Sequence, residues 1–332
     1  MLKNFLVTGG SGFIGSHFID LLLSKNLNVI NVDLKRDKLR KKNKNYKFKL
    51  GNICNYNFLN KIVNNKIDCI VNFAAQTHVD KSIDFPRDFV QNNILGTFNL
   101  LEVIRKKNLN PIFIQISTDE VFGSLSKTEK SFNENSTIKP NSPYSASKAS
   151  ADHLVMSYNK TFNLKTIITH SSNNFGERQH PEKLIPLSIM RLLNNKEIPI
   201  YGNGKNIRDW IYVKDNCKCI YQLITKGKFG NSYLVGAANE LTNISLVNKI
   251  LTIFKALTNL KIKNKGYKFV NDRKGHDFRY SINNKKLVRL TNIKFSNFDK
   301  NLKKTINHYI NYNQFYQIML KEKWLKEKIK NY

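Results

Sequence analysis

The chain has 332 residues, of which 41% are hydrophobic and 11% aromatic. This length and composition exclude a disordered protein, and no apolar stretch approaches the ~20 residues that a membrane span needs. The net charge of +31 would attract polyanions, but the lysines alternate with asparagines along the whole chain, without an arginine tract. We therefore expect a cytoplasmic protein that binds neither nucleic acid nor membrane; a basic face that helps to recruit an anionic substrate is the alternative.

In the first half of the chain, short apolar runs alternate with amphipathic segments. The predicted helices span residues 13–25, 87–107 and 142–162. The predicted strands span residues 4–8, 28–33, 46–50, 68–73, 111–117 and 165–171. Because these strands are apolar on both sides and alternate with helices, the sequence predicts an α/β fold with a doubly wound parallel sheet.

Beyond residue 172 the alternation gives way to segments rich in Gly, Pro and Asn. A helix over 213–226 and a strand over 231–236 are expected to return to the sheet. Residues 241–332 are expected to be mostly helical, with one loop at 270–280. The C-terminal segment KEKWLKEKIKNY is expected to form a helix or a loose basic tail.

These segments indicate two interleaved units. A Rossmann-type dinucleotide-binding domain would span 1–172 and regain 213–240. A smaller substrate-binding lobe would comprise 173–212 and 241–332.

The four cysteines are dispersed, and only Cys217 and Cys219 lie close together. A single C-x-C pair lacks the second ligand pair of a zinc site. We therefore expect reduced thiols and no metal.

The segment TGGSGFIG lies between the first predicted strand and the first predicted helix. In this context Gly9 permits a tight turn, Gly12 lets the backbone approach a pyrophosphate, and Gly15 allows close helix packing. The helix N-terminus would add N–H groups and partial positive charge. The motif therefore predicts a dinucleotide-binding turn.

Asp33 ends the second predicted strand. A carboxylate there can accept hydrogen bonds from an adenosine ribose and would repel a 2′-phosphate, which favours NAD over NADP. Lys35 and Arg36 follow closely and keep NADP as the alternative.

Tyr144 and Lys148 are four residues apart at the start of a predicted helix, so they share one face. A free tyrosine has a pKa near ~10, and a neighbouring ammonium would stabilise its phenolate. A surface Tyr beside a surface Lys is the alternative. Because the pair follows a dinucleotide turn, we favour a catalytic base.

STDEVFG, which follows a predicted strand, places two acids side by side, Asp119 and Glu120. One interpretation is a capping box with Ser117 as the N-cap and Glu120 three residues later. The other is a catalytic acid and base at the carboxyl end of a strand.

The glycine turn, Asp33 and the Ser-Thr and Tyr-Lys motifs together resemble the extended short-chain dehydrogenase/reductase family. STDEVFG, SSNNFGERQHPEKLIP, IYGNGKNIRDWIYVKDN and DRKGHDFRY narrow the resemblance to the dTDP-glucose 4,6-dehydratases, over essentially the whole chain. The resemblance implies NAD, a nucleotide-diphosphate sugar as substrate and a homodimer with its interface on the helices at 87–107 and 142–162. The alternatives are the same reaction on UDP-glucose, CDP-glucose or a UDP-N-acetylhexosamine, a 4-epimerase, although those relatives lack the Asp-Glu pair, and a nucleic-acid-binding protein that uses this fold.

The resemblance also implies roles for five residues. Tyr144, supported by Lys148, would deprotonate the C4 hydroxyl that Thr118 holds. Asp119 would protonate the departing C6 hydroxyl, and Glu120 would remove the C5 proton. The hydride would leave C4 for NAD and return to C6.

Further contacts are implied by motif position. The cofactor would be contacted by Gly9, Gly12, Phe13, Ile14, Gly15, Asp33, Asn52, Ile53, Ala74, Ala75, Thr77, Asn92, Ser117, Tyr144, Lys148 and Asn174. The substrate would be contacted by Thr77, Thr118, Asn173, Lys183, Leu184, Pro199, Tyr201, Arg208, Asn243, Arg273 and His276. The chain departs from the usual pattern at Asn52 (usually Asp), Gln76 (usually Glu) and Glu177 (usually Pro).

Overall fold

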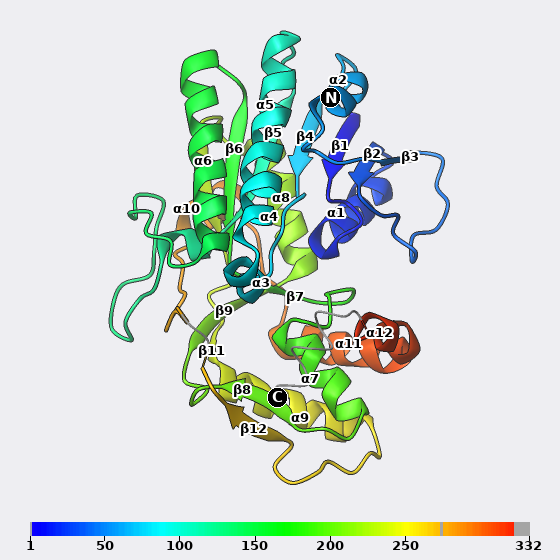
Figure 1. Cartoon of the computed structure of the whole chain (residues 1–332), viewed down its shortest axis with the longest axis vertical. Coiled ribbons are helices and arrows are strands. Elements are labelled where there is room, and N and C mark those ends of the chain that lie inside the picture. The colour runs from blue at the N-terminus through cyan, green and yellow to red at the C-terminus, as the bar shows by residue number, and fades with distance from the viewer. Residues whose placement is uncertain (1, 273–274, 322–332) are drawn as a thin grey trace.

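The computed structural model describes residues 2–272 and 275–321 (Figure 1). Arg273 and almost all of the C-terminal segment expected as a helix or basic tail lie outside the described residues. No helix in these two ranges is long and apolar enough to cross a bilayer.

A seven-stranded sheet forms the upper part of the molecule (Figure 1), with the strand order β10-β6-β5-β4-β1-β2-β3 and every pair parallel. Its strands are β1 (Asn4–Thr8), β2 (Asn28–Asp33), β3 (Tyr46–Leu50), β4 (Cys69–Asn72), β5 (Ile112–Thr118), β6 (Thr166–Ser171) and β10 (Asn231–Val235). The predicted strands match these within one residue at either end, and β10 joins the sheet beside β6.

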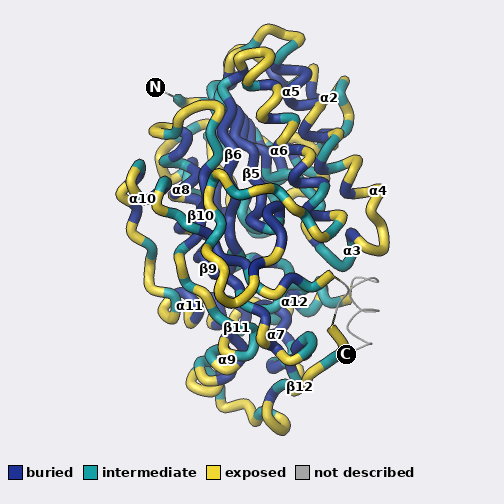
Figure 2. Tube along the Cα trace, turned by 90° about the vertical axis from the view of Figure 1, so that its left-hand side faces the viewer, coloured by how far each residue is buried: buried dark blue, intermediate teal, exposed yellow. Residues whose placement is uncertain are grey.

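Helices cover both faces of the sheet because its strands are apolar on both sides. On one face lie α1 (Phe13–Ser24), α8 (Val213–Lys226) and α10 (Lys285–Thr291); on the other lie α2 (Tyr56–Ile62), α5 (Gly96–Lys106) and α6 (Pro143–Phe162) (Figure 1). Alternate strand residues therefore serve two cores: Val7 packs towards α1 and α8, and Leu6 packs towards α5. In Figure 2 the strands form the buried interior between these layers.

A smaller lobe lies below the carboxyl ends of the strands. A three-stranded sheet contains β7 (Asn173–Phe175), β9 (Ile207–Tyr212) and β11 (Glu240–Thr242), and β8 (Ile198–Tyr201) pairs with β12 (Tyr267–Val270). Its helices are α7 (Leu184–Leu193), α9 (Asn243–Leu257), α11 (Phe298–Asn311) and α12 (Asn313–Met319). The hydrophobic core continues from the large sheet into this lobe. β12 lies where the sequence predicted mostly helix, because pairing with β8 overrides local preference.

The helix predicted over 87–107 is interrupted. It consists of α4 (Pro86–Phe89), a π-helical turn (Val90–Leu95) and α5, after the short helix α3 (Val79–Asp84). The wider π turn leaves Asn93 pointing inwards, where its amide donates to the Gln76 carbonyl at 3.0 Å and to Ser147 Oγ at 2.8 Å. The interruption therefore ties the loop after β4 to α6.

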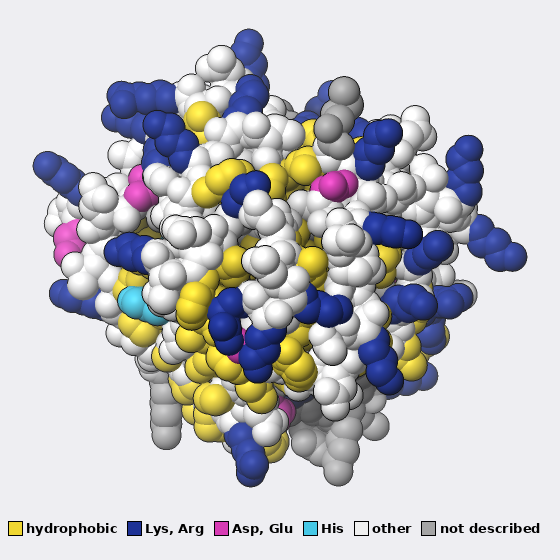
Figure 3. All heavy atoms as spheres, turned by 90° about the horizontal axis from the view of Figure 1, so that it is seen from above, with side chains coloured by type: hydrophobic (Ala, Val, Ile, Leu, Met, Phe, Trp, Pro, Cys, Tyr) yellow, Lys and Arg dark blue, Asp and Glu magenta, His cyan; other side chains and the backbone are white. Residues whose placement is uncertain are grey.

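Lys and Arg side chains are scattered over the face seen in Figure 3, between patches of hydrophobic surface, and do not gather into one tract.

Candidate active site

The glycine turn between β1 and α1 has the close backbone approach expected of a dinucleotide site. Gly9 adopts φ +66°, and a Cβ there would lie 2.6 Å from the nitrogen of Ala74. A Cβ on Gly15 would lie 2.5 Å from the Gly9 carbonyl oxygen. Gly12 is the N-cap of α1 and brings no side chain to the helix N-terminus. Phe13 and Ile14 open this helix, so its N–H groups are available to an anion.

Asp33 lies at the carboxyl end of β2, where an adenosine ribose would be recognised. Its Oδ2 accepts from the Ser11 amide at 2.9 Å, and its Oδ1 accepts from the Lys35 amide at 3.2 Å. Burial raises the pKa of Asp33, whereas these backbone hydrogen bonds lower it. The turn and the fixed carboxylate together fit NAD.

Several other predicted cofactor residues are held by their neighbours. Asn52 Oδ1 accepts from the Cys54 amide at 2.9 Å, and Asn92 donates to the Asp88 carbonyl at 2.7 Å. Asn174 Oδ1 accepts from Asn216 at 2.8 Å. Ile53 is buried in the core, and Ala75 and Thr77 follow β4.

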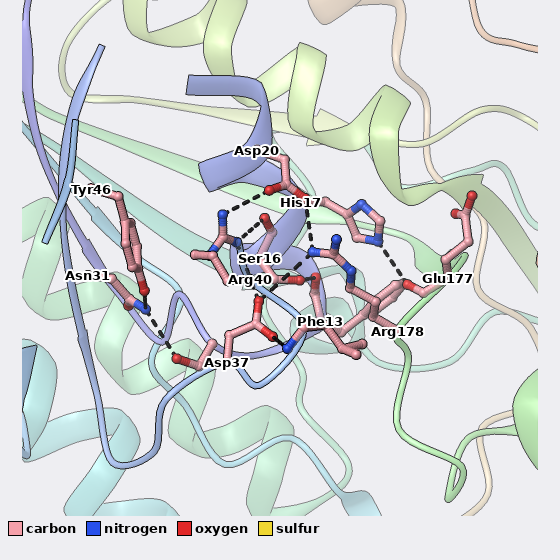
Figure 4. Close-up of polar contacts among 12 residues, drawn as sticks. Phe13, Ser16, His17, Asp20, Asn31, Asp37, Arg40, Tyr46, Glu177 and Arg178 are labelled. Carbon is pink, nitrogen blue, oxygen red and sulfur yellow. Dashed lines mark hydrogen bonds and ion pairs between the residues drawn. The ribbon is translucent and has the colours of Figure 1, made fainter. Parts of the chain in front are cut away.

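A charged cluster that sequence reasoning missed fixes the loop after Asp33 (Figure 4). The side chain of Arg40, from this loop, is buried and donates to Asp20 Oδ1 and to the Ser16 carbonyl, each at 2.8 Å. Arg178, from the loop after β7, donates to the other oxygen of Asp20 at 2.9 Å. Asp20 thus joins the predicted adenosine site to the smaller lobe. Nothing in the sequence distinguishes these residues from surface charges.

Glu177, where the family pattern usually has Pro, extends this contact (Figure 4). Its carbonyl oxygen accepts from His17 Nε2 at 2.8 Å. Its carboxylate accepts from the Tyr212 hydroxyl at 2.9 Å and pairs with Lys214 at 3.4 Å. The unusual residue therefore has a structural role between α1 and β9.

The two acids of STDEVFG begin a 3₁₀ helix (Asp119–Phe122) directly after β5. The capping-box interpretation is wrong in its residues: Thr118, not Ser117, is the N-cap and accepts from the Glu120 amide at 3.3 Å. Ser117 remains in the strand and donates to Asp152. The tight 3₁₀ turn directs Asp119 into the interior and Glu120 towards the cavity described below.

Asp119 is only 1% exposed. Burial raises its pKa well above the ordinary value, and the charges of Glu120 and Asp209 raise it further, against a smaller lowering by Arg208. This environment favours the protonated form of Asp119, which is the form that a general acid requires.

Tyr144 and Lys148 lie on the buried face of α6, which begins with a capping box of Ser142 and Ser145. Lys148 Nζ donates to the Ile116 carbonyl at 2.5 Å, and burial lowers the pKa of Lys148. Burial and the charge of Glu120 raise the pKa of Tyr144, and its hydrogen bond with Thr118 lowers it.

We expected Lys148 to lower the pKa of Tyr144. Without a bound cofactor, Lys148 is not among the largest influences on this pKa. Desolvation dominates, and the charges that affect the Tyr144 pKa most strongly are those of the carboxylates Glu120, Asp119 and Asp152. The cationic ring of bound NAD is the charge that would offset them.

A cavity of about 190 Å³ opens between the large sheet and the smaller lobe. The predicted residues in its wall are Glu120, Asn173, Asn174, Lys183, Leu184, Pro199, Tyr201, Arg208, Asn243 and His276. Sequence reasoning missed His78, Asp80, Gln179, Glu182, Trp210 and Tyr280, which also line it. Asp119, Tyr144 and Lys148 lie outside its wall, in the interior.

Arg208 is the buried cation of this cavity. Its guanidinium donates to the carbonyls of Asp277 and Phe278 at 2.9 and 3.2 Å and stacks 4.3 Å from the Tyr280 ring centroid. These contacts fix the orientation of a planar group suited to a diphosphate.

The chain matches a protein family described as GDP-mannose 4,6 dehydratase over residues 6–304. A dTDP-glucose 4,6-dehydratase from Haemophilus influenzae is 41% identical, with 93% of this chain and 98% of that protein covered. This chain belongs to the 4,6-dehydratase family.

Two solved dehydratases have the same fold. A dTDP-glucose 4,6-dehydratase from Streptomyces venezuelae, with NAD bound, is 34% identical with a TM-score of 0.90 and covers 96% of this chain and 100% of its own. One from Bacillus anthracis, in complex with NAD, is 38% identical with a TM-score of 0.85 and covers 96% and 99%. The expected fold class, the dehydratase activity and the NAD cofactor are confirmed.

Beneath the Tyr-Lys pair, this dehydratase has a buried polar group that sequence reasoning missed. Asp152 is fully buried, and its Oδ2 lies 2.5 Å from Ser117 Oγ and 3.1 Å from His170 Nε2. Asp152 is four residues after Lys148 on the same helix, so the helical period could have indicated it.

Proposed function

We propose that the chain converts dTDP-glucose to dTDP-4-keto-6-deoxyglucose and water. The observation that carries this proposal is the pair of adjacent acids at the end of β5, one buried and one lining the cavity, beside Tyr144. Oxidation at C4 alone would need only a base for O4. The two further groups suit an elimination across C5 and C6.

In this reaction NAD, when bound, accepts a hydride from C4 and returns it to C6. Gly9, Gly12, Gly15 and Asp33 would hold it, because the turn has no room for side chains and the carboxylate is fixed. Lys148 would act as the neighbouring cation on the face of α6 that carries Tyr144.

The chain's acid and base groups would move three protons. Tyr144 takes the proton of O4 while Thr118 holds the hydroxyl. The resulting ketone acidifies C5, and Glu120 removes the C5 proton. Asp119, whose buried position favours its protonated form, donates to the departing C6 hydroxyl. Each acid–base role is worth on the order of 10²–10⁴ in rate.

The nucleotide end of the substrate would lie along the cavity wall formed by the smaller lobe. Arg208 would pair with the diphosphate, and Tyr201 would border the base. Thymine is supported as this base because the relatives from Haemophilus influenzae and Streptomyces venezuelae are dTDP-glucose 4,6-dehydratases. UDP-glucose and CDP-glucose are the competing substrates.

A panel of dTDP-, UDP- and CDP-sugars tests the proposal. After incubation with the NAD-loaded enzyme, mass spectrometry should show loss of one water from dTDP-glucose at the highest kcat/KM. Faster turnover of another nucleotide sugar would reassign the substrate, and no loss of water from any would refute dehydration.

We also propose a homodimer that packs the helices of residues 87–107 and 142–162 against a second copy. α5 and α6 lie side by side on one face (Figure 1). This face exposes large apolar side chains, among them Phe98 (36%), Met156 (40%) and Phe162 (43%). Exposed apolar patches of this kind are typical of interfaces.

Light scattering tests the dimer. The native chain should elute at twice its mass of 38.6 kDa, and Phe98→Glu with Met156→Glu should shift it to a monomer. Phe269→Glu, at an exposed residue of the smaller lobe, is the control and should leave the dimer intact. A native monomer would refute the proposal.

A further inference from the structure

The proposed dehydration leaves two groups in the wrong protonation state after each turnover. Tyr144 ends with the proton of the C4 hydroxyl, because the product keeps a ketone there. Asp119 ends without its proton, which has left in the water. Glu120 takes a proton from C5 and returns one to C5, so it ends unchanged. One proton must therefore pass from Tyr144 to Asp119 before the next turnover.

Bulk water has little access to either group. Asp119 is 1% exposed and Tyr144 is 8% exposed. Substrate or product in the cavity would cover them further. An internal route would therefore let the site reset without opening.

Thr118 provides such a route. Its Oγ1 can donate to Asp119 Oδ1 at 3.4 Å, and it lies close enough to Tyr144 to lower the pKa of that phenol as a hydrogen-bond partner. A hydroxyl both accepts and donates. The Tyr144 hydroxyl can thus donate to Oγ1 while Thr118 donates to Asp119. The 3.4 Å separation must shorten by roughly 0.6 Å to reach an ordinary O–H···O distance; catalytic hydrogen bonds are often long without substrate and tighten when it binds.

We propose that Thr118 relays the proton from Tyr144 to Asp119 and so resets the site. The O–H bond of Tyr144 breaks as its proton passes to Oγ1, and Thr118 gives its own proton to Asp119 Oδ1. The products are a phenolate and a neutral carboxylic acid, so no proton is gained or lost. This inference rests on the proposed dehydration and adds a second role to Thr118, beyond holding the C4 hydroxyl.

The electrostatics of the site act on both groups of this transfer. Ordinary pKa values of about 10 for tyrosine and 3.9 for aspartate oppose it. Burial, with Glu120 and Asp209, raises the pKa of Asp119 and so favours its protonation, whereas burial and Glu120 also raise the pKa of Tyr144. The positive ring that NAD carries at the end of the cycle would stabilise the phenolate.

Thr118→Val and Thr118→Ser test the relay. Valine keeps the shape of threonine without its hydroxyl, whereas serine keeps the hydroxyl. With excess dTDP-glucose, rapid-quench measurement of the valine variant should show one product per active site, followed by a steady rate at least tenfold slower. The serine variant should show no such drop. Loss of the hydrogen bond to O4 slows the first turnover and the later turnovers of the valine variant alike. The quantity to compare is therefore the ratio of the first-turnover rate to the steady rate.

Equal rates in the first and later turnovers of Thr118→Val would overturn the relay. Release of the product, dTDP-4-keto-6-deoxyglucose, must also be measured, by the intrinsic fluorescence to which Trp210 in the cavity wall contributes. Release as slow as the steady phase would assign the burst to release and equally overturn the relay. Failure of the proposed function is distinct, because the native chain would then form no product.

Discussion

Asp152→Asn removes a buried negative charge near Lys148 while preserving the size of the side chain. Lys148 is 4% exposed, and Asp152 is fully buried. Side chains four residues apart on a helix have Cβ atoms about 5–6 Å apart. Two unit charges at ~6 Å with an effective dielectric constant of about 20 interact by about 3 kcal/mol. We expect the variant to lose about this much free energy of unfolding near pH 7.

The loss should depend on pH. Burial already lowers the pKa of Lys148, whereas Asp152 raises it; removing Asp152 should lower it by a further ~2 units. Above that lowered pKa, the folded variant binds fewer protons than its unfolded chain, so its stability rises with pH relative to the native chain. The difference should therefore shrink as the pH rises from that lowered pKa to the pKa of Lys148 in the native fold, which itself lies below the ordinary value of about 10.4.

Urea denaturation at pH 7 and pH 9.5 measures this difference. Asp68→Asn is a control for loss of a carboxylate, because Asp68 accepts the amides of Lys3 and Asn4, at the other end of the strands from Lys148. The loss of unfolding free energy caused by Asp68→Asn should not shrink between pH 7 and pH 9.5 as the loss caused by Asp152→Asn does. An equal loss for Asp152→Asn at both pH values would refute the charge pairing.

Three further predictions concern catalysis and the cofactor. Asp119→Asn should slow elimination by about 10²–10⁴ but still oxidise C4, so stopped-flow absorbance should show reduced cofactor that persists. Tyr144→Phe should show no reduced cofactor, and an equal loss of this signal in both variants would contradict the assigned roles. Asp209→Asn removes a charge that helps raise the pKa of Asp119, so the alkaline limb of kcat should move to lower pH, and an unmoved limb would argue against this coupling. Arg178→Ala breaks a partly exposed ion pair worth below about 1 kcal/mol, but it should speed NAD dissociation several-fold, measured as NAD retained after gel filtration. Lys249→Ala breaks an exposed ion pair elsewhere and should not change NAD retention.

Local patterns were sufficient for the parallel sheet. Except for the exposed edge strand β3, which follows β2 without a helix, its strands are short, apolar and separated by helices, and burial on both faces leaves little choice of arrangement. Helix 87–107 was harder to predict, because its π turn depends on Asn93 bonding to Gln76 and Ser147. β12 also needed its partner, since its strand geometry depends on pairing with β8.

The residues of the site also divide into those that local motifs predicted and those that they did not. Motifs placed Asp119, Glu120, Tyr144 and Lys148 in the sequence, because catalytic groups sit at fixed offsets from a strand end or a helix start. Asp152 shares the face of α6 that carries Tyr144 and Lys148, but no motif distinguishes it from a surface acid.

The sequence by itself determined the class of fold, the dinucleotide turn and the set of reacting side chains. These follow from periodicity and from short motifs whose residues are neighbours in the chain. Only the tertiary structure decided the environment of these groups: that Asp119 is sealed from water, that Thr118 lies between it and Tyr144, and that Asp20 links two loops through Arg40 and Arg178. Burial and charge pairing depend on residues distant in sequence, and local patterns do not encode them.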